Sequence, residues 1–146
     1  MDPINTVRRM RDAASDDLKF AAIRLDGEAI QYFSDSATDE MKWAAIRAIP
    51  ESIQYFADES TDEMKWAAID ADPTTLQFFV HLATVEMKLK ALEKNGEVIE
   101  FLYDEATDEM KLVALHQNGL AIESFVDTAT DEMKFTAIEC DGEAIQ

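Results

Sequence analysis

The side chains of this sequence that could carry catalysis or bind a metal are two histidines, one cysteine and many carboxylates. His81 and His116 belong to neither an H-x-x-x-H nor an E-x-x-H arrangement, the spacings that place ligands on one face of a helix. They also fall at different positions of the repeat described below, so we interpret both as surface residues. Cys140 has no histidine near it in sequence, and we interpret it as a core or end-cap thiol.

The carboxylates do not have the spacing of a calcium site. An EF-hand loop needs oxygen ligands at alternate positions, a glycine at the sixth position and a glutamate at the twelfth. The recurring motif D-E-M-K instead supplies adjacent acids that diverge on a helix, followed by a lysine. No phosphate-binding loop, dinucleotide fingerprint or G-x-S-x-G motif occurs either. We therefore expect no enzyme activity, no cofactor and no metal site.

Composition narrows the class of protein further. The chain has 146 residues, 31 acids against 13 bases, a net charge of −18 and 47% hydrophobic residues, enough to form a core. No apolar run reaches the roughly 18 residues of a membrane span, and the start MDPINTVRRMRD has no apolar segment of a signal peptide. The negative charge argues against direct binding to nucleic acid or anionic lipid. These features predict an acidic cytoplasmic protein.

A repeat of 23 residues organises the chain. It is marked by a lysine at the same position of each unit: Lys19, Lys42, Lys65, Lys88, Lys111 and Lys134. The predicted single repeat domain contains an N-terminal half-repeat cap and a partial last repeat: 1–14, 15–37, 38–60, 61–83, 84–106, 107–129 and 130–146. Positions within a repeat are numbered 1 to 23 below.

Each repeat reads as two short helices. Position 1 is always Ser or Thr, the preferred N-cap, and acids follow it, so a first helix of about ten residues is expected. Position 13 is either Gly or Pro. Gly suits the left-handed residue after a helix, and Pro suits the start of the next helix, so we expect one turn made in two ways.

The second predicted helix carries one apolar stripe at positions 16, 19, 20 and 23, exemplified by Ile53, Phe56, Ala57 and Ser60. The first helix has apolar residues on two sides, with polar strips between them, one of which holds Lys42. A helix buried on two sides is expected between neighbouring repeats. The sequence therefore predicts an all-α fold, an α-solenoid of about six helix-turn-helix repeats, with the methionines at position 4 in its core.

The pattern K-x-x-A-[IL]-x-x-[ND]-G-x-A-I, present in Lys19–Ile30 and Lys111–Ile122, resembles a tandem helical repeat of unknown function found in bacteria, protists and giant viruses. The resemblance covers nearly the whole chain. A weaker likeness is to variant leucine-rich repeats. Both imply a helical-repeat fold, and neither implies an activity.

The acids follow a pattern along one predicted edge. Positions 21 and 22 end one repeat and positions 2 and 3 begin the next, so carboxylates at these four positions cluster once per repeat. We call this set the acidic edge: Asp58, Glu59, Asp62, Glu63, Asp104, Glu105, Asp108, Glu109, Asp127, Asp131 and Glu132. The net charge is −2 over residues 1–47 and −16 over residues 48–146.

Two hypotheses for the acids remain open. In the first, the acidic edge binds the basic surface of a nucleic-acid-handling protein, as DNA-mimicking phage or mobile-element inhibitors of restriction and CRISPR enzymes do. Six repeats of about 10 Å would carry roughly half the charge density of duplex DNA, which has one charge per about 1.7 Å. In the second, the chain is an ordinary solenoid scaffold for protein partners, and the acids only maintain solubility.

Two further surfaces are hypotheses at this point. Trp43 and Trp66 occur in the two complete repeats that use proline at position 13, and they are either locally different packing or aromatic anchors for a partner. The short last repeat predicts a surface for self-association, where Cys140 and Ile145 would lie near their counterparts in a homodimer.

Overall fold

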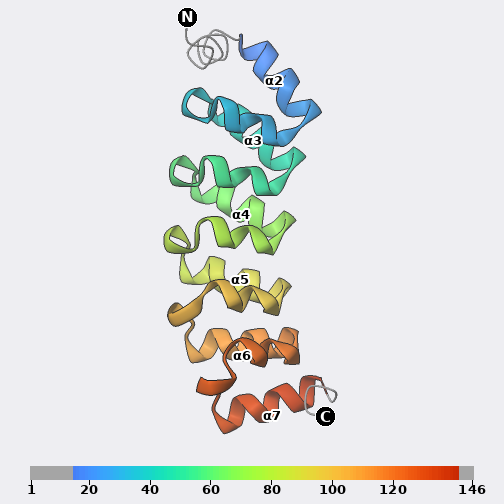
Figure 1. Ribbon diagram of the computed structural model, residues 1–146, viewed down its shortest axis with the longest axis vertical. Helices are drawn as coiled ribbons and strands as arrows, with labels where there is room; N and C mark the ends of the chain where they lie inside the picture. Colours follow the sequence, from blue (N-terminus) through green and yellow to red (C-terminus); the bar gives the residue numbers. More distant parts are fainter. Residues whose placement is uncertain (1–14, 142–146) are drawn as a thin grey trace, which may run out of the picture. The chain divides into compact units, whose positions relative to one another are not determined.

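The computed structural model describes residues 15–141 (Figure 1), and every regular element in that range is a helix. The chain forms two compact units that adjoin in sequence between Ala71 and Asp72. We call their described parts the N-terminal unit, residues 15–71, and the C-terminal unit, residues 72–141. The half-repeat cap predicted for residues 1–14, and Ile145, lie outside the described residues.

Both units alternate an α-helix of ten residues with two short 3₁₀ helices, which are labelled η. The N-terminal unit contains α2 (Asp16–Leu25), η1 (Gly27–Tyr32), η2 (Ser34–Ser36), α3 (Asp39–Ala48), η3 (Pro50–Tyr55), η4 (Ala57–Glu59) and α4 (Asp62–Ala71). The C-terminal unit contains η5 (Pro73–Phe78), η6 (Val80–Leu82), α5 (Val85–Lys94), η7 (Gly96–Phe101), η8 (Tyr103–Glu105), α6 (Asp108–Gln117), η9 (Gly119–Ser124), η10 (Val126–Thr128) and α7 (Asp131–Cys140).

The predicted start of each α-helix is confirmed. The hydroxyl oxygen at position 1 accepts a hydrogen bond from the backbone N–H at position 4 in all six repeats, as Thr38 does from Met41 at 3.3 Å. Acidic side chains occupy the first turn of each helix, where they interact favourably with its dipole. Local sequence therefore fixes where each α-helix begins.

The second half of each repeat is not one helix, as the stripe of positions 16, 19, 20 and 23 predicted, but two 3₁₀ segments. The chain leaves helical geometry at position 19 in most repeats, as at Phe56, where φ is −147° and ψ is 27°. Residues three apart eclipse one another in a 3₁₀ helix, so positions 13, 16 and 19 share one side. Gly27, Ile30 and Phe33 are accordingly all buried.

Position 13 does not make two kinds of turn. Gly27 and Pro50 are each the first residue of a 3₁₀ helix, and each follows an extended residue. No described glycine has the left-handed backbone that we predicted. Glycine is instead required by space, because a Cβ on Gly96 would lie 2.5 Å from the carbonyl oxygen of Ala114 in the next repeat.

The core consists of apolar columns that run through consecutive repeats. Met41, Met64, Met87, Met110 and Met133 are at most 2% exposed, which confirms the prediction that position 4 is core. Position 9 and position 16 supply the larger aliphatic side chains. Neighbouring α-helices pack against each other and against the 3₁₀ helices between them, so each unit is a solenoid-like stack of repeats. No helix among residues 15–141 is long and apolar enough to cross a membrane.

Candidate functional site

The acidic edge forms where one repeat passes into the next. In the N-terminal unit, Asp58 and Glu59 lie in η4, while Asp62 and Glu63 make up the first turn of α4. Only two residues separate the pairs along the chain, and all four side chains are exposed. The structure therefore places these four carboxylates around a single turn, as the repeat positions predicted.

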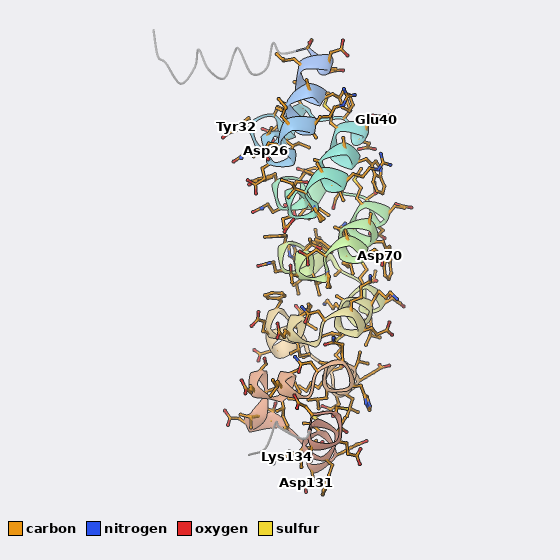
Figure 2. The ribbon with its side chains drawn as sticks, turned by 90° about the vertical axis from the view of Figure 1, so that its right-hand side faces the viewer. Asp26, Tyr32, Glu40, Asp70, Asp131 and Lys134 are labelled. Atoms are coloured by element: carbon orange, nitrogen blue, oxygen red, sulfur yellow. The ribbon has the colours of Figure 1, made fainter. Side chains whose placement is uncertain are left out.

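The same arrangement recurs in the C-terminal unit. Its members lie in η8 and η10 or in the first turns of α6 and α7, and all are exposed: Asp104, Glu105, Asp108, Glu109, Asp127, Asp131 and Glu132. Figure 2 labels Asp131 at the start of α7. Acids in the first turn of an α-helix are also stabilised by the helix dipole. The acids at positions 21 and 22 precede the N-cap, so they lie outside that first turn.

The first three lysines of the column are buried rather than part of a polar surface strip, which corrects the expectation for Lys42, whereas Lys88 and Lys111 are half-buried and Lys134 is exposed. Lys19, Lys42 and Lys65 are only 5–8% exposed. The ammonium of Lys19 donates to Ser36 Oγ at 3.1 Å, and that of Lys65 donates to the Ser60 carbonyl oxygen at 2.9 Å. These lysines connect the α-helix to the 3₁₀ segments, where an unpaired ammonium would be costly.

Aromatic rings complete the surroundings of several of these ammonium groups. The Nζ atoms of Lys19, Lys42 and Lys111 lie 5.5–5.9 Å from the centres of the phenylalanine rings at position 19 of their own repeats. Such cation–π contacts favour a fixed lysine position. These three lysines therefore have structural roles inside their repeats.

In repeat 84–106 the lysine reaches the acidic edge directly. Lys88 Nζ lies 2.6 Å from Glu105 Oε2, and this hydrogen bond, together with the lysine's charge, lowers the pKa of Glu105. In repeat 61–83 position 22 is Leu82, and Lys65 instead pairs with Asp62 of its own helix, at 3.8 Å. Acids nevertheless exceed bases by thirteen to five in the N-terminal unit and by fifteen to five in the C-terminal unit.

The two units thus carry similar negative charge. The lower net charge that the sequence shows over residues 1–47 arises in part from Arg8, Arg9 and Arg11, which lie outside the described residues. Both units contain members of the acidic edge, but at the turn of residues 81–86 the matching positions hold a single acid: His81, Leu82, Val85 and Glu86.

Trp43 and Trp66 are half-buried, between the two alternatives that the sequence left open. The guanidinium of Arg47 lies 5.7 Å from the centre of the Trp43 ring, one turn further along α3. Each indole has both a packed and an accessible side. Their role as anchors for a partner remains a prediction.

An aromatic row at position 18 is a surface that the sequence analysis missed. Tyr32 is 61% exposed and Tyr55 is half-buried. Desolvation, followed by the nearby carboxylates of Glu28 and Asp26, raises the pKa of Tyr55. Figure 2 shows Asp26 and Tyr32 on the opposite side of the ribbon from Glu40 of α3. The row could have been found from its 23-residue spacing, which continues in Phe78 and Phe101.

The structure also brings together two residues that we expected to be separate. Cys140 Sγ lies 3.8 Å from His116 Nδ1, joining the ends of α7 and α6. Both residues are exposed, so Cys140 is not the core thiol that was one of two expectations, and it lies at the last residue of α7. They are 24 residues apart, one repeat plus one residue, and this spacing was the signal for their proximity.

The pair has no third partner of the kind that a metal site requires. Among residues 15–141, no group of three or more His, Cys, Asp and Glu side chains is placed to hold a metal ion. His81 is exposed in η6 of repeat 61–83, whereas Cys140 belongs to the last repeat, 130–146. The contact is therefore a thiol–imidazole hydrogen bond at the protein surface.

The last α-helix exposes apolar side chains that earlier helices bury. Ile138 of α7 is 42% exposed, whereas Ile46, Ile69 and Leu92 at the same position are at most 3% exposed. Phe135 is 67% exposed. These two side chains lie on the helix that carries Cys140, the residue to which the sequence assigned self-association.

Comparison with other proteins identified no relative of this chain. No protein-family model, curated protein or solved structure was found to match the chain. The resemblance to a tandem helical repeat stays a prediction from the sequence pattern.

Proposed function

We propose that this chain is a non-enzymatic protein-binding module whose acidic edge occupies the basic surface of a nucleic-acid-handling protein. The proposed mode of action is nucleic-acid mimicry, as in phage or mobile-element inhibitors of restriction or CRISPR enzymes. The observation that carries the proposal is the recurrence of clustered, exposed carboxylates at the turns between repeats, except at 81–86, while Lys19, Lys42 and Lys65 are buried within their repeats.

The charge density of the C-terminal unit supports this mode. Its fifteen acids and five bases give a net charge of −10. The unit contains about three repeats, so at roughly 10 Å per stacked repeat it carries one net charge per about 3 Å. Duplex DNA carries one per about 1.7 Å. A protein groove adapted to a phosphate backbone would meet about half the charge it normally binds.

Positions 21 and 22 argue for a role beyond helix capping. Carboxylates at positions 2 and 3 stabilise the α-helix that they begin, whatever else they do. Asp104 and Asp127 precede the N-cap residues Thr107 and Thr130, so they lie outside the first turns of α6 and α7. Their alignment with the first-turn acids supports a surface used for binding.

The direct test is capture of partners from a lysate of the source cell at low salt, followed by elution with a salt step and mass spectrometry. A nuclease, polymerase, repair protein or CRISPR effector in the eluate that DNA or RNA displaces would support mimicry. An edge variant, D108N/E109Q/E132Q, should recover much less of it. A control variant with equal charge change away from the edge, E93Q/E97Q/E139Q, should recover it nearly as well as the unmodified chain.

The ordinary scaffold is the alternative outcome of the same experiment. Partners that stay bound through the salt step, and that both variants capture equally, would show that the acids serve solvation. The half-buried indoles of Trp43 and Trp66 are then the side chains to test next, because partly accessible aromatic residues often dominate protein interfaces.

A further inference from the structure

A hollow of about 620 Å³ lies within the C-terminal unit, between the 3₁₀ segments of repeats 84–106 and 107–129. Four exposed carboxylates line it: Glu100, Asp104, Glu123 and Asp127. Ile99, Phe125 and Val126 provide apolar surface, and Lys111 provides the one ammonium group among the lining residues. Its volume is in the range of pockets that bind small ligands or single peptide segments.

The hollow coincides with a departure from the repeat at position 17. This position is glutamine in three repeats, at Gln31, Gln54 and Gln77, but it is glutamate at 100 and 123. The two repeats that differ are the two that form the hollow. The change from amide to carboxylate adds two negative charges to the lining.

A second departure from the repeat, at position 18, leaves room for the hollow. Position 18 is aromatic in the four repeats before it, ending with Phe101, and is serine at Ser124, which lines the hollow. The neighbouring Phe125 is half-buried, whereas Phe56 and Phe79 at the same position are at most 2% exposed. A missing ring and a partly uncovered ring therefore occur together.

The lining combines charge and a flat apolar surface. Four carboxylates against one ammonium leave a net charge of −3. Lys111 Nζ is held by Thr128 Oγ1 at 3.2 Å and lies 5.5 Å from the centre of the Phe125 ring. A guanidinium pairs with carboxylates through its edge and stacks on aromatic rings through its face, which a compact ammonium does less well.

We infer that this hollow binds arginine side chains from an extended segment of a basic partner protein. The inference rests on the proposed function, since it supplies the specific contact on a partner that the acidic edge attracts. Carboxylates at 100 and 123 would pair with the edge of the guanidinium, and its plane would contact the side of the Phe125 ring that the Lys111 ammonium leaves free. The acidic edge then provides attraction at a distance, and the hollow provides selectivity for arginine.

The test measures binding of fluorescein-labelled hexa-arginine to the full chain by fluorescence anisotropy at low salt, with hexa-lysine as the comparison. E100Q/E123Q restores the glutamines of the other repeats. S124F places at position 18 the aromatic residue that the preceding repeat has at Phe101, which fills the hollow with no change in charge. The control E93Q/E139Q removes two carboxylates of α5 and α7 that do not line the hollow. Circular dichroism and thermal unfolding establish that each variant is folded.

We expect hexa-arginine to bind more tightly than hexa-lysine. E100Q/E123Q should weaken hexa-arginine binding about tenfold, and the control should weaken it by about twofold or less, because paired carboxylates contribute more than distant ones. S124F should weaken it severalfold.

Equal binding of the two peptides, equal effects of E100Q/E123Q and the control, or no binding of hexa-arginine would each overturn the inference. If S124F fails to fold, the comparison between E100Q/E123Q and E93Q/E139Q still tests the inference. The partner capture with D108N/E109Q/E132Q leaves all four carboxylates of the hollow intact. That experiment can therefore succeed or fail independently of this one.

Discussion

Two junctions of the N-terminal unit differ in the residue at position 13 and in how extensively their α-helices contact each other. Gly27 precedes the junction between α2 and α3, and Pro50 precedes the junction between α3 and α4. The first pair of α-helices makes extensive contact, while the second pair meets at fewer positions. Both Gly27 and Pro50 begin a 3₁₀ helix after an extended residue, so the local backbone is the same.

The difference follows from the space beside the next helix. A Cβ on Gly27 would lie 3.1 Å from both the carbonyl oxygen of Ala45 and the Cβ of Ala48. A proline at this position brings ring atoms toward the next helix, so that helix must lie further away. In the C-terminal unit, the junctions that follow Gly96 and Gly119 resemble that of Gly27. We therefore expect position 13 to determine how closely neighbouring α-helices pack.

Other residues change together with the proline. The two complete repeats with Pro50 and Pro73 are the ones that carry the large indoles of Trp43 and Trp66. We expect the half-buried indole of Trp43 to occupy part of the space between α3 and α4, which meet at fewer positions than α2 and α3 do.

The largest effect is expected where glycine permits the closest approach. Gly96→Ala should lower the free energy of unfolding by about 2–3 kcal/mol, since overpacking of a tight site costs about that much. Gly27→Ala should cost about 1 kcal/mol on the same scale, because its Cβ contacts are longer. Urea unfolding of both variants gives the comparison. If the two substitutions cost the same, contact with the next helix is not what selects glycine.

Position 15 offers a second contrast, because it is a hydroxyl in both proline repeats. Thr75 is fully buried, and its Oγ1 donates to the Asp72 carbonyl oxygen at 2.7 Å. Ser52 is equally buried, but its Oγ has no hydrogen-bond partner among residues 15–141.

Thr75→Val should therefore lower the free energy of unfolding by about 1 kcal/mol, and Ser52→Ala should raise it by about 1 kcal/mol. Alanine already occupies this position at Ala29 and Ala121. Chemical denaturation of each single variant measures the change. A loss of stability in Ser52→Ala would mean that the hydroxyl has a partner.

Pro50→Gly should make the second junction more like the first. We expect α4 to move toward α3, and the free energy of unfolding to fall by about 0.5–1 kcal/mol because glycine loosens the unfolded chain. The readout is acrylamide quenching of Trp43 fluorescence in a W66F background, which should decrease as the indole becomes more covered. Unchanged quenching would show that proline does not hold the helices apart.

The smallest expected effect concerns position 22, which is Glu105 in repeat 84–106 and Thr128 in repeat 107–129. The pKa of Glu105 is lowered by Lys88, so the carboxylate stabilises the fold above its ordinary pKa of 4.5 and loses this contribution as the pH falls through its lowered pKa. Glu105→Gln should therefore be less stable than the unmodified chain at pH 7, and the difference should shrink as the pH falls through the lowered pKa of Glu105. In a Lys88→Met background, this pH-dependent difference should disappear.

The sequence by itself determined the features that depend on local chemistry and on strict repetition. The hydroxyl at position 1 caps each helix wherever it occurs, and the buried methionines follow from a period of 23. The exposure of the acidic edge could also be predicted, because charged residues on both sides of a turn remain in water. None of these features depends on the exact distance between repeats.

Tertiary packing decided the rest. Gly27, Gly96 and Gly119 leave room for a carbonyl oxygen of the following helix, which the local sequence does not contain. The contact between His116 and Cys140, and the hollow beside Phe125, likewise form between residues of successive repeats. The periodic stripe in the second half of each repeat suits both an α-helix and a 3₁₀ helix, and the buried residue at position 19 interrupts helical geometry there. Local sequence patterns indicate which helices form, but contacts between repeats fix the spacing of those helices and create the surfaces available for binding.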